Sequence, residues 1–211
     1  MTAPTLTFAF PKGRVGGPLA ELLAKPPLSL PPLSGRGLVV EHPEKGLRLL
    51  LLKDFDVPTY VRRGTAELGV AGADVLAEKD AEDLPRPLDL PFGRCRFSLL
   101  APVGAPPPSR GRAIRVATRY VRLTRDYFEA KGVAAEIVPL AGSVELAARM
   151  GLADCVADLV DTGETMRANG LEEIERIREI VPSVVVSRGA IARRRTEIFR
   201  FLETLEGMLR P

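Results

Sequence analysis

Short apolar segments alternate along this chain with segments that have the composition of short helices. Residues 67–72 form an apolar run that ends in glycine, and residues 73–80 follow it with a helical pattern. The same order recurs at 114–117 with 123–131, and again further along the chain. Strands that alternate with helices are typical of layered α/β domains in which most strands are parallel. We therefore predict an α/β fold with mostly parallel strands.

The remaining elements follow from the same patterns and from the positions of proline and glycine. Strands are expected at residues 5–10, 47–53, 97–102, 135–139, 155–160 and 184–187, and helices at 19–24, 59–64, 144–150 and 164–168. Apolar residues from Ile191 to Leu209 recur at helical spacing and predict a terminal helix. The proline-rich residues 25–37 and 104–111 are expected to be irregular. The linker-like composition of 83–92 indicates two α/β lobes joined by crossing strands.

Few residues in this chain could support metal or nucleophilic chemistry. The 211 residues include one histidine and two cysteines, whereas a structural zinc site needs about four such ligands. His42, between Glu41 and Pro43, is expected in a solvent-facing turn, which disfavours a Ser-His-Asp triad. The net charge is +3, and aromatic residues make up 5% of the chain with no tryptophan. This composition favours anionic small molecules over nucleic acid as partners.

No segment of the sequence is typical of export or of a membrane span. The N-terminus lacks a charged region followed by an apolar stretch, and the longest apolar run, Leu49–Leu52, is only strand-sized. We expect a cytoplasmic protein with no membrane partner. Cys95 and Cys155 are then expected to be packing residues rather than a disulfide.

The segment that carries most chemistry is 142–165. A buried strand, 155–160, leads into a turn of small and hydroxyl residues at the start of a helix. Glycine allows the backbone to approach a ligand closely, and the free N–H groups at a helix start favour a phosphate. Asp158 and Asp161 precede the turn, where they could accept hydrogen bonds from ribose hydroxyls or face a magnesium ion. The alternative is an ordinary helix N-cap at Thr162 beside two solvated aspartates.

Residues 142–171 resemble the phosphoribosyl-pyrophosphate loop region of ATP phosphoribosyltransferases. Further blocks match that family in the same order: Phe10–Arg14, Asp56–Val61, Glu67–Leu76, Phe92–Arg96 and Arg115–Tyr120. Ordered blocks over most of the chain are a far stronger signal than a single glycine loop.

The resemblance implies a two-lobed α/β fold similar to type-II periplasmic binding proteins, with the active site in the cleft between the lobes. We place lobe I at residues 1–90 with 182–211, and lobe II at 91–181. The implied reaction joins N1 of ATP to the anomeric carbon of phosphoribosyl pyrophosphate, with inversion and release of pyrophosphate. It is the first step of histidine biosynthesis.

The resemblance also implies a cofactor and partners. Mg²⁺ is expected on the substrate phosphates rather than on a dedicated protein site. By its length, the chain resembles the short form of the family, which lacks a C-terminal histidine-sensing domain. Such forms imply a separate regulatory subunit similar to histidyl-tRNA synthetases, and we expect a homo-oligomer.

Candidate site residues follow from the matched blocks. Lys12 and Arg14 are the catalytic candidates, in contact with pyrophosphate or triphosphate, with a solvated basic turn as the alternative. Glu145 is expected to bind ribose hydroxyls or only to complement a helix dipole. Around the 5′-phosphate the resemblance implies Thr162, Gly163, Glu164 and Thr165, with the Glu164 side chain pointing away. The other expected substrate-binding residues are Gly13, Asp74, Arg96, Thr118, Arg119, Asp158 and Asp161.

The chain departs from the family at one position. Many short forms carry Ser-Arg-Lys after Pro-Glu-Lys or a similar tripeptide, whereas Pro43-Glu44-Lys45 is followed here by Gly46-Leu47-Arg48. Either Arg48 makes the expected contact to pyrophosphate from a shifted position, or that contact is missing.

Two other functions stay open at this point. A non-catalytic bilobal module that binds a small anion or nucleotide would explain the fold without chemistry. Nucleic-acid binding through Arg193–Arg195 is the third hypothesis, although arginines on a terminal helix are more often its solvated face.

Overall fold

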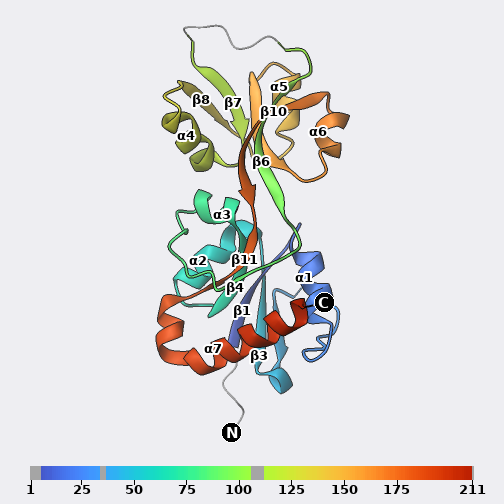
Figure 1. The fold of residues 1–211 in the computed structure, drawn as a ribbon, viewed down its shortest axis with the longest axis vertical. Coiled ribbons are helices and arrows are strands. Elements are labelled where there is room, and N and C mark those ends of the chain that lie inside the picture. The colour runs from blue at the N-terminus through green and yellow to red at the C-terminus, as the bar shows by residue number, and fades with distance from the viewer. Residues whose placement is uncertain (1–5, 34–36, 106–111, 211) are drawn as a thin grey trace. The chain divides into compact units, whose positions relative to one another are not determined.

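The computed structural model describes residues 6–33, 37–105 and 112–210. It divides into two compact units, the first formed by Met1–Gly93 with Val181–Pro211 and the second by Arg94–Ile180. Figure 1 gives the order of the elements along the chain. The chain passes between the units twice, after Gly93 and after Ile180.

The first unit is built on a six-stranded mixed sheet in the order β2-β3-β1-β4-β11-β5. The strands are β1 (Leu6–Pro11), β2 (Val39–His42), β3 (Leu47–Leu52), β4 (Leu68–Gly72), β5 (Leu88–Asp89) and β11 (Pro182–Val186). The central strand β1 pairs in parallel with β3 and β4, while β2, β5 and β11 pair antiparallel. Short 3₁₀ helices, η1 (Pro43–Lys45) and η2 (Asp54–Asp56), flank β3.

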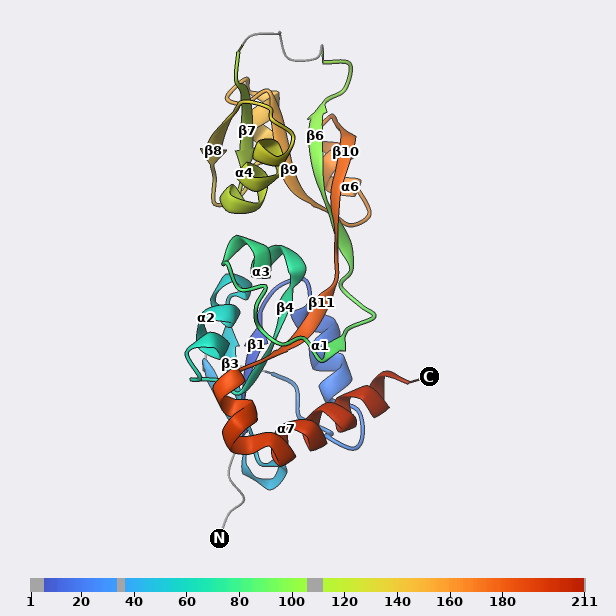
Figure 2. The same cartoon turned by 60° about the vertical axis from the view of Figure 1, so that its left-hand side comes forward.

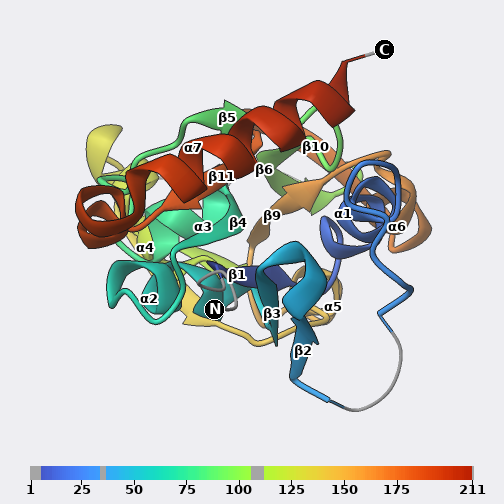
Figure 3. The same ribbon diagram turned by 90° about the horizontal axis from the view of Figure 1, so that it is seen from below.

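Helices cover both faces of this sheet because its strands are apolar on both sides. Phe8 and Phe10 pack into one cluster with α1 (Gly16–Leu23) and α7 (Arg188–Leu209). Ala9, between them, packs on the opposite face with α2 (Val57–Arg62) and α3 (Ala73–Glu78). Figures 2 and 3 show α1 and α2 on opposite sides of the sheet. Parallel strands buried on both faces are the arrangement expected of α/β domains.

The second unit has a five-stranded mixed sheet in the order β10-β6-β9-β7-β8. Its strands are β6 (Cys95–Pro102), β7 (Ile114–Thr118), β8 (Ala135–Pro139), β9 (Cys155–Val160) and β10 (Leu171–Ile180). One face packs against α5 (Glu145–Arg149) and α6 (Glu164–Ala168), which contribute Ala147, Ala148 and Met166 to its apolar cluster. The turn into α4 (Val121–Ala130) brings Tyr120 edge-on to Phe97, with ring centroids 5.4 Å apart.

The expected helices and strands are confirmed, but the prediction of mostly parallel strands is wrong. Of the nine pairings between described strands, five are antiparallel. Strands β2, β5 and β10 were not expected from the sequence, and each pairs antiparallel. In β10 the isoleucines at 174, 177 and 180 recur every third residue, so the segment lacks the alternation that marks a strand.

One smaller expectation is wrong, and another is only partly covered by the described residues. His42 is 4% exposed at the end of β2, so it is a buried residue and not a solvent-facing one. Part of the expected loop at 104–111 lies outside the described residues. Among the helices that the structure describes, none combines the length and the apolar character that a membrane span requires.

Candidate active site

The turn between β9 and α6 forms a pocket within the second unit. It has a volume of about 150 Å³. Most of the expected substrate-binding residues of this unit line it together: Glu145, Asp158, Asp161, Thr162, Gly163, Glu164 and Thr165. Leu100, Leu159, Val160 and Met166 complete the lining. Glu145 reaches the pocket from the first turn of α5, which lies far from α6 in the sequence.

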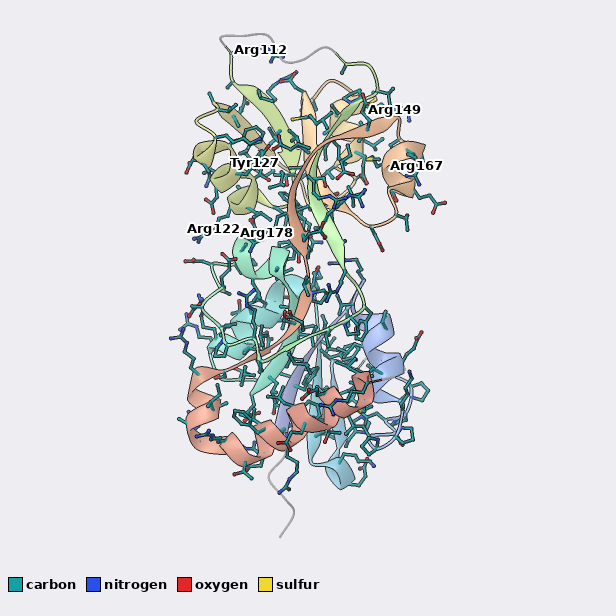
Figure 4. All side chains as sticks on the ribbon, in the orientation of Figure 1. Arg112, Arg122, Tyr127, Arg149, Arg167 and Arg178 are labelled. Atoms are coloured by element: carbon teal, nitrogen blue, oxygen red, sulfur yellow. The ribbon has the colours of Figure 1, made fainter. Side chains whose placement is uncertain are left out.

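Gly163 sets the direction of the chain where it enters α6. It is the N-cap of the helix and has φ of 75°, a left-handed conformation that disfavours other residues. A methyl group at this position would lie 2.9 Å from Nη1 of Arg167, so that guanidinium lies over the turn. Arg167, labelled in Figure 4, therefore supplies a positive charge beside a pocket otherwise rich in carboxylates.

Main-chain N–H groups at the start of α6 are available to a ligand. In the part of the chain that the structure describes, the amides of Thr165 and Met166 have no hydrogen-bond acceptor, as is usual in a first helical turn. The amide of Glu164 meets Thr162 Oγ1 only at 3.3 Å. Because α6 has five residues, direct hydrogen bonds rather than a long helix dipole would hold an anion here.

Arg96 does not line the pocket, but it contacts the turn that does. Its Nε and Nη2 atoms bind the carboxylate of Glu173 on β10, at 2.8 and 2.7 Å. Its Nη1 donates to the carbonyl oxygen of Asp161 at 2.9 Å. The hydrogen bond to Glu173 raises the pKa of Arg96, and the same contact lowers the pKa of Glu173. Both groups are therefore charged at neutral pH.

Thr118 is the last residue of β7 and Arg119 follows it, and β7 lies on the other side of β9 from β6. Thr118 is completely buried, its hydroxyl donates to the carbonyl of Ala157 at 2.7 Å, and it accepts from the amide of Tyr120 at 2.9 Å. In this conformation the Thr118 hydroxyl is inaccessible to a substrate and holds the turn into α4. Arg119 is half-buried and does not line the pocket.

The other expected residues, Lys12, Gly13, Arg14 and Asp74, belong to the first unit. They follow the parallel strands β1 and β4, whose carboxyl ends share one edge of the sheet. Lys12 is exposed, and Gly13 has φ of 97°. Arg14 is half-buried and donates from Nη1 to the carbonyl of Gly93. Asp74 is 2% exposed.

Arg48 does not join this group. Thr7 and Arg48 are register partners near the start of β1, whereas Pro11 and Leu52 are partners at its end. Arg48 is therefore four residues before the end of β3, which is about 13 Å along the strand at the usual rise per residue. Arg48 instead binds Glu41 on the neighbouring strand, with Nε 2.6 Å from Oε1.

The two cysteines are buried, and two arginines of the basic run on α7 contact other side chains of the protein. Cys95 and Cys155 are buried and form no disulfide, and burial raises the pKa of Cys155 to about 12. Arg194 binds Glu67 at 3.3 Å with its side chain 17% exposed, and Arg195 stacks on Phe199 with its guanidinium carbon 5.5 Å from the ring centroid. The arginines of α7 therefore do not form one solvated basic face.

Sequence reasoning missed Glu173, Ser98 and Arg167. The first two contact Arg96 or its partner from β10 and β6, and β10 itself carried no strand signal. Arg167 follows Gly163 at a spacing of four residues, which brings it back over the turn once the helix starts there.

Two α/β units, one of them with a pocket of carboxylates and available main-chain amides at the end of a buried strand, define a two-unit α/β protein with a candidate anion-binding pocket. A solved periplasmic aliphatic sulphonate binding protein, SsuA from Escherichia coli, is similar over 98% of this chain and 68% of its own, with a TM-score of 0.62. At 14% identity this likeness shows the fold alone. The expected fold of the type-II periplasmic-binding-protein kind is confirmed.

Closer relatives identify the family. The model of HisG: ATP phosphoribosyltransferase matches residues 53–207. An ATP phosphoribosyltransferase of Syntrophotalea carbinolica is 44% identical over 97% of this chain and 95% of its own. The solved ATP phosphoribosyl transferase (HisG:HisZ) complex from Thermotoga maritima has a chain of 34% identity and TM-score 0.87, covering 97% of this chain and 98% of that one.

The chain therefore belongs to the ATP phosphoribosyltransferase family. It is an enzyme, a glycosyltransferase of histidine biosynthesis, and the non-catalytic binding module is disfavoured.

Proposed function

We propose that this chain transfers the phosphoribosyl group of phosphoribosyl pyrophosphate to N1 of ATP, and that the pocket after β9 binds the ribose 5-phosphate half of the donor. The observation that carries the site assignment is the convergence of Glu145 with the turn 158–165 in one pocket. The cytoplasmic location expected from the sequence is part of the same proposal, since ATP is a substrate there.

The two kinds of group in the pocket suit the two ends of ribose 5-phosphate. The amides of Thr165 and Met166 and the hydroxyls of Thr162 and Thr165 would donate to phosphate oxygens. Arg167 would add a positive charge from above the turn. Carboxylates only accept hydrogen bonds, so we assign Glu145, Asp158 and Asp161 to the ribose hydroxyls.

The reaction needs orientation and charge stabilisation rather than a protein nucleophile. The lone pair of ATP N1 forms the new bond to the anomeric carbon while the bond from that carbon to the pyrophosphate oxygen breaks, with inversion. Positive charge develops on the ribose, where nearby carboxylates stabilise it, and negative charge develops on pyrophosphate. The raised pKa of Cys155 fits a mechanism without a thiolate.

We assign the residues of the first unit to the phosphates of pyrophosphate or ATP. Lys12 presents an exposed ammonium directly after β1. Arg14 shares its guanidinium with the Gly93 carbonyl, so only part of it is available to a phosphate. The positive φ of Gly13 lets these two side chains follow a tight turn.

We propose that Mg²⁺ enters this site on the substrate phosphates. Among the residues that the structure describes, no group of three or more acidic, histidine or cysteine side chains is placed to hold a metal. Magnesium usually binds to substrate phosphates with few protein carboxylates, and Asp158 or Asp161 could supply those. When bound, the ion would offset negative charge on the departing pyrophosphate.

We also propose that the chain assembles with copies of itself and with a regulatory subunit. The Thermotoga maritima relative was solved as a HisG:HisZ complex, and it matches this chain over nearly its whole length. The regulatory subunit would be the partner similar to histidyl-tRNA synthetases.

A pyrophosphate-release assay with ATP, phosphoribosyl pyrophosphate and Mg²⁺, with and without the regulatory subunit, tests the function. Thr165→Ala and Asp158→Asn should each lower turnover at least tenfold, about 1.4 kcal/mol in the barrier. Asn keeps the acceptor for the Leu159 amide, so folding should be unaffected. Thr196→Ala on the exposed side of α7 is the matched control. Full turnover in both site variants would remove this pocket from the reaction.

A further inference from the structure

A buried-to-half-buried polar cluster lies beside the pocket, on strands β6 and β10. Both oxygens of the Glu173 carboxylate bind Arg96, and Oε1 also accepts a hydrogen bond from Ser98 Oγ at 2.7 Å. Ser98 is completely buried, and the side chains of Arg96 and Glu173 are 21% and 22% exposed. Arg176 approaches the same carboxylate more loosely, at 3.9 Å, and makes a shorter contact to Glu179 at 2.8 Å.

The cluster is connected directly to the pocket. Arg96 uses its remaining nitrogen, Nη1, to bind the carbonyl oxygen of Asp161 at 2.9 Å. Asp161 is the first residue after β9 and lines the pocket. Ser98 is the register partner of Asp158, another lining residue. Glu173 is thus connected through a single side chain, that of Arg96, to the backbone of the turn 158–165.

Packing alone does not explain why the charged pair of Arg96 and Glu173 occurs on these strands. On the same sheet face, Leu100, Val156, Val160 and Leu171 form an apolar cluster. Partly burying an ion pair costs desolvation energy, and apolar side chains of similar volume often stabilise such a place equally well. What the pair adds is geometry, because a guanidinium held by two carboxylate oxygens has a fixed plane.

The irregular pairing of β10 with β6 supports this role. The register shifts between Glu173 and Glu175, and again between Arg176 and Arg178. Such irregularities redirect side chains beside active sites. The two strands are otherwise continuously paired from Leu171 to Ile180, so they give Glu173 a rigid base.

We propose that Glu173 is a positioning residue for donor binding: it fixes the plane of Arg96, and Arg96 fixes the Asp161 carbonyl and with it the turn that holds the 5-phosphate. This inference rests on the proposed function of the pocket. It assigns Arg96 to the support of the turn and not to direct contact with substrate.

Glu173→Gln tests the proposal, with titration of phosphoribosyl pyrophosphate and of ATP, each alone, into the folded full chain. Glutamine keeps the shape but offers one acceptor oxygen where Arg96 needs two. We expect the dissociation constant for phosphoribosyl pyrophosphate to rise about tenfold and that for ATP to stay unchanged. Glu172→Gln is the matched control, since Glu172 neighbours Glu173 but binds the Gly104 amide. It should change neither constant.

A second measurement separates positioning from general loosening of the unit. Arg96→Lys should weaken donor binding by a similar factor, and the double variant should be no weaker than either single one, since both act through one contact to Asp161. Equal weakening of ATP and donor, additive effects, or a wild-type constant in Glu173→Gln would overturn the proposal. If Glu173→Gln does not fold, Ser98→Ala removes one contact to the same carboxylate, and unchanged donor binding there would also contradict it.

Thr165→Ala distinguishes failure of this inference from failure of the function beneath it. If Thr165→Ala binds the donor normally, the turn is not the phosphate site and both proposals fail. If Thr165→Ala weakens donor binding and Glu173→Gln does not, only the positioning role is wrong.

Discussion

Replacing Gly163 with alanine should affect the stability of the protein and its binding of the donor by two separate routes. At φ of 75° an alanine costs about 1–2 kcal/mol, of which about 0.4–1 kcal/mol is offset because alanine restricts the unfolded chain. We therefore expect the free energy of unfolding to fall by about 1 kcal/mol. The atoms nearest to the new methyl group are ends of flexible side chains, Arg167 Nη1 at 2.9 Å and Met166 Cε at 3.4 Å. They can move, so crowding should add little.

The second route acts on binding, because the displaced atom belongs to the guanidinium above the turn. We expect the dissociation constant for phosphoribosyl pyrophosphate to rise about tenfold, which is about 1.4 kcal/mol. Gly132→Ala is the matched control in the same unit, with φ of 65° and no atom within 4 Å of the new methyl group. It should lose similar stability and bind the donor normally.

Denaturant unfolding and calorimetric titration of the three proteins measure both quantities. Normal donor binding by Gly163→Ala, at a stability equal to that of Gly132→Ala, would refute the assignment of this turn and of Arg167 to the phosphate. A stability loss several times that of Gly132→Ala would show that the side chains of Arg167 and Met166 cannot move away from the new methyl group.

Three further predictions concern residues outside the pocket. Arg48→Ala should leave kcat/KM for both substrates unchanged and cost at most about 1 kcal/mol of stability, because Arg48 forms an exposed pair with Glu41; a large kinetic defect would show that Arg48 does reach the substrate. Asp154 accepts hydrogen bonds from Arg112 and Arg115, which hold its pKa below its ordinary value. Its stabilisation is therefore present above about pH 4 and declines as the pH falls through the folded-state pKa, and acid titration of Asp154→Asn should show a flatter stability profile below pH 4. Cys155 should resist alkylation at pH 8 in the folded protein and react after unfolding, and rapid labelling of the native thiol would contradict its burial.

The sequence was sufficient for the elements whose residues alternate or recur regularly. Strand β9 and helix α6 were expected at the bounds that they have, and the turn between them was expected to bind phosphate. Local pattern and turn chemistry determine such segments. Strand β10 could not be predicted, because six of its ten residues are charged and its isoleucines recur every third residue. It is a strand because β6 pairs with it.

The same limit applies to the site residues. The turn residues could be chosen from composition and family resemblance, since each contributes through its own backbone or its own short side chain. Arg96 and Thr118 lie at or near the ends of strands of the same unit and looked equivalent in the sequence. The structure separates them, because the Thr118 hydroxyl is completely buried between backbone groups whereas Arg96 reaches the carbonyl of Asp161. Which atoms a side chain meets across a sheet depends on register, and the sequence does not show register.

The carboxylates around the phosphate turn are compatible with an anionic donor only if the two ends of the donor meet different groups. Asp158 lies in β9 and Glu145 at the start of α5, whereas the free amides belong to the first turn of α6. If the 5-phosphate binds these amides, the ribose of the donor lies next to the carboxylates. There they accept hydrogen bonds in the ground state and face a ring that becomes positive as pyrophosphate leaves. Because repulsion from the phosphate acts in both states while attraction to the ring grows only in the transition state, Asp158→Asn should lower kcat more than it raises the dissociation constant for the donor.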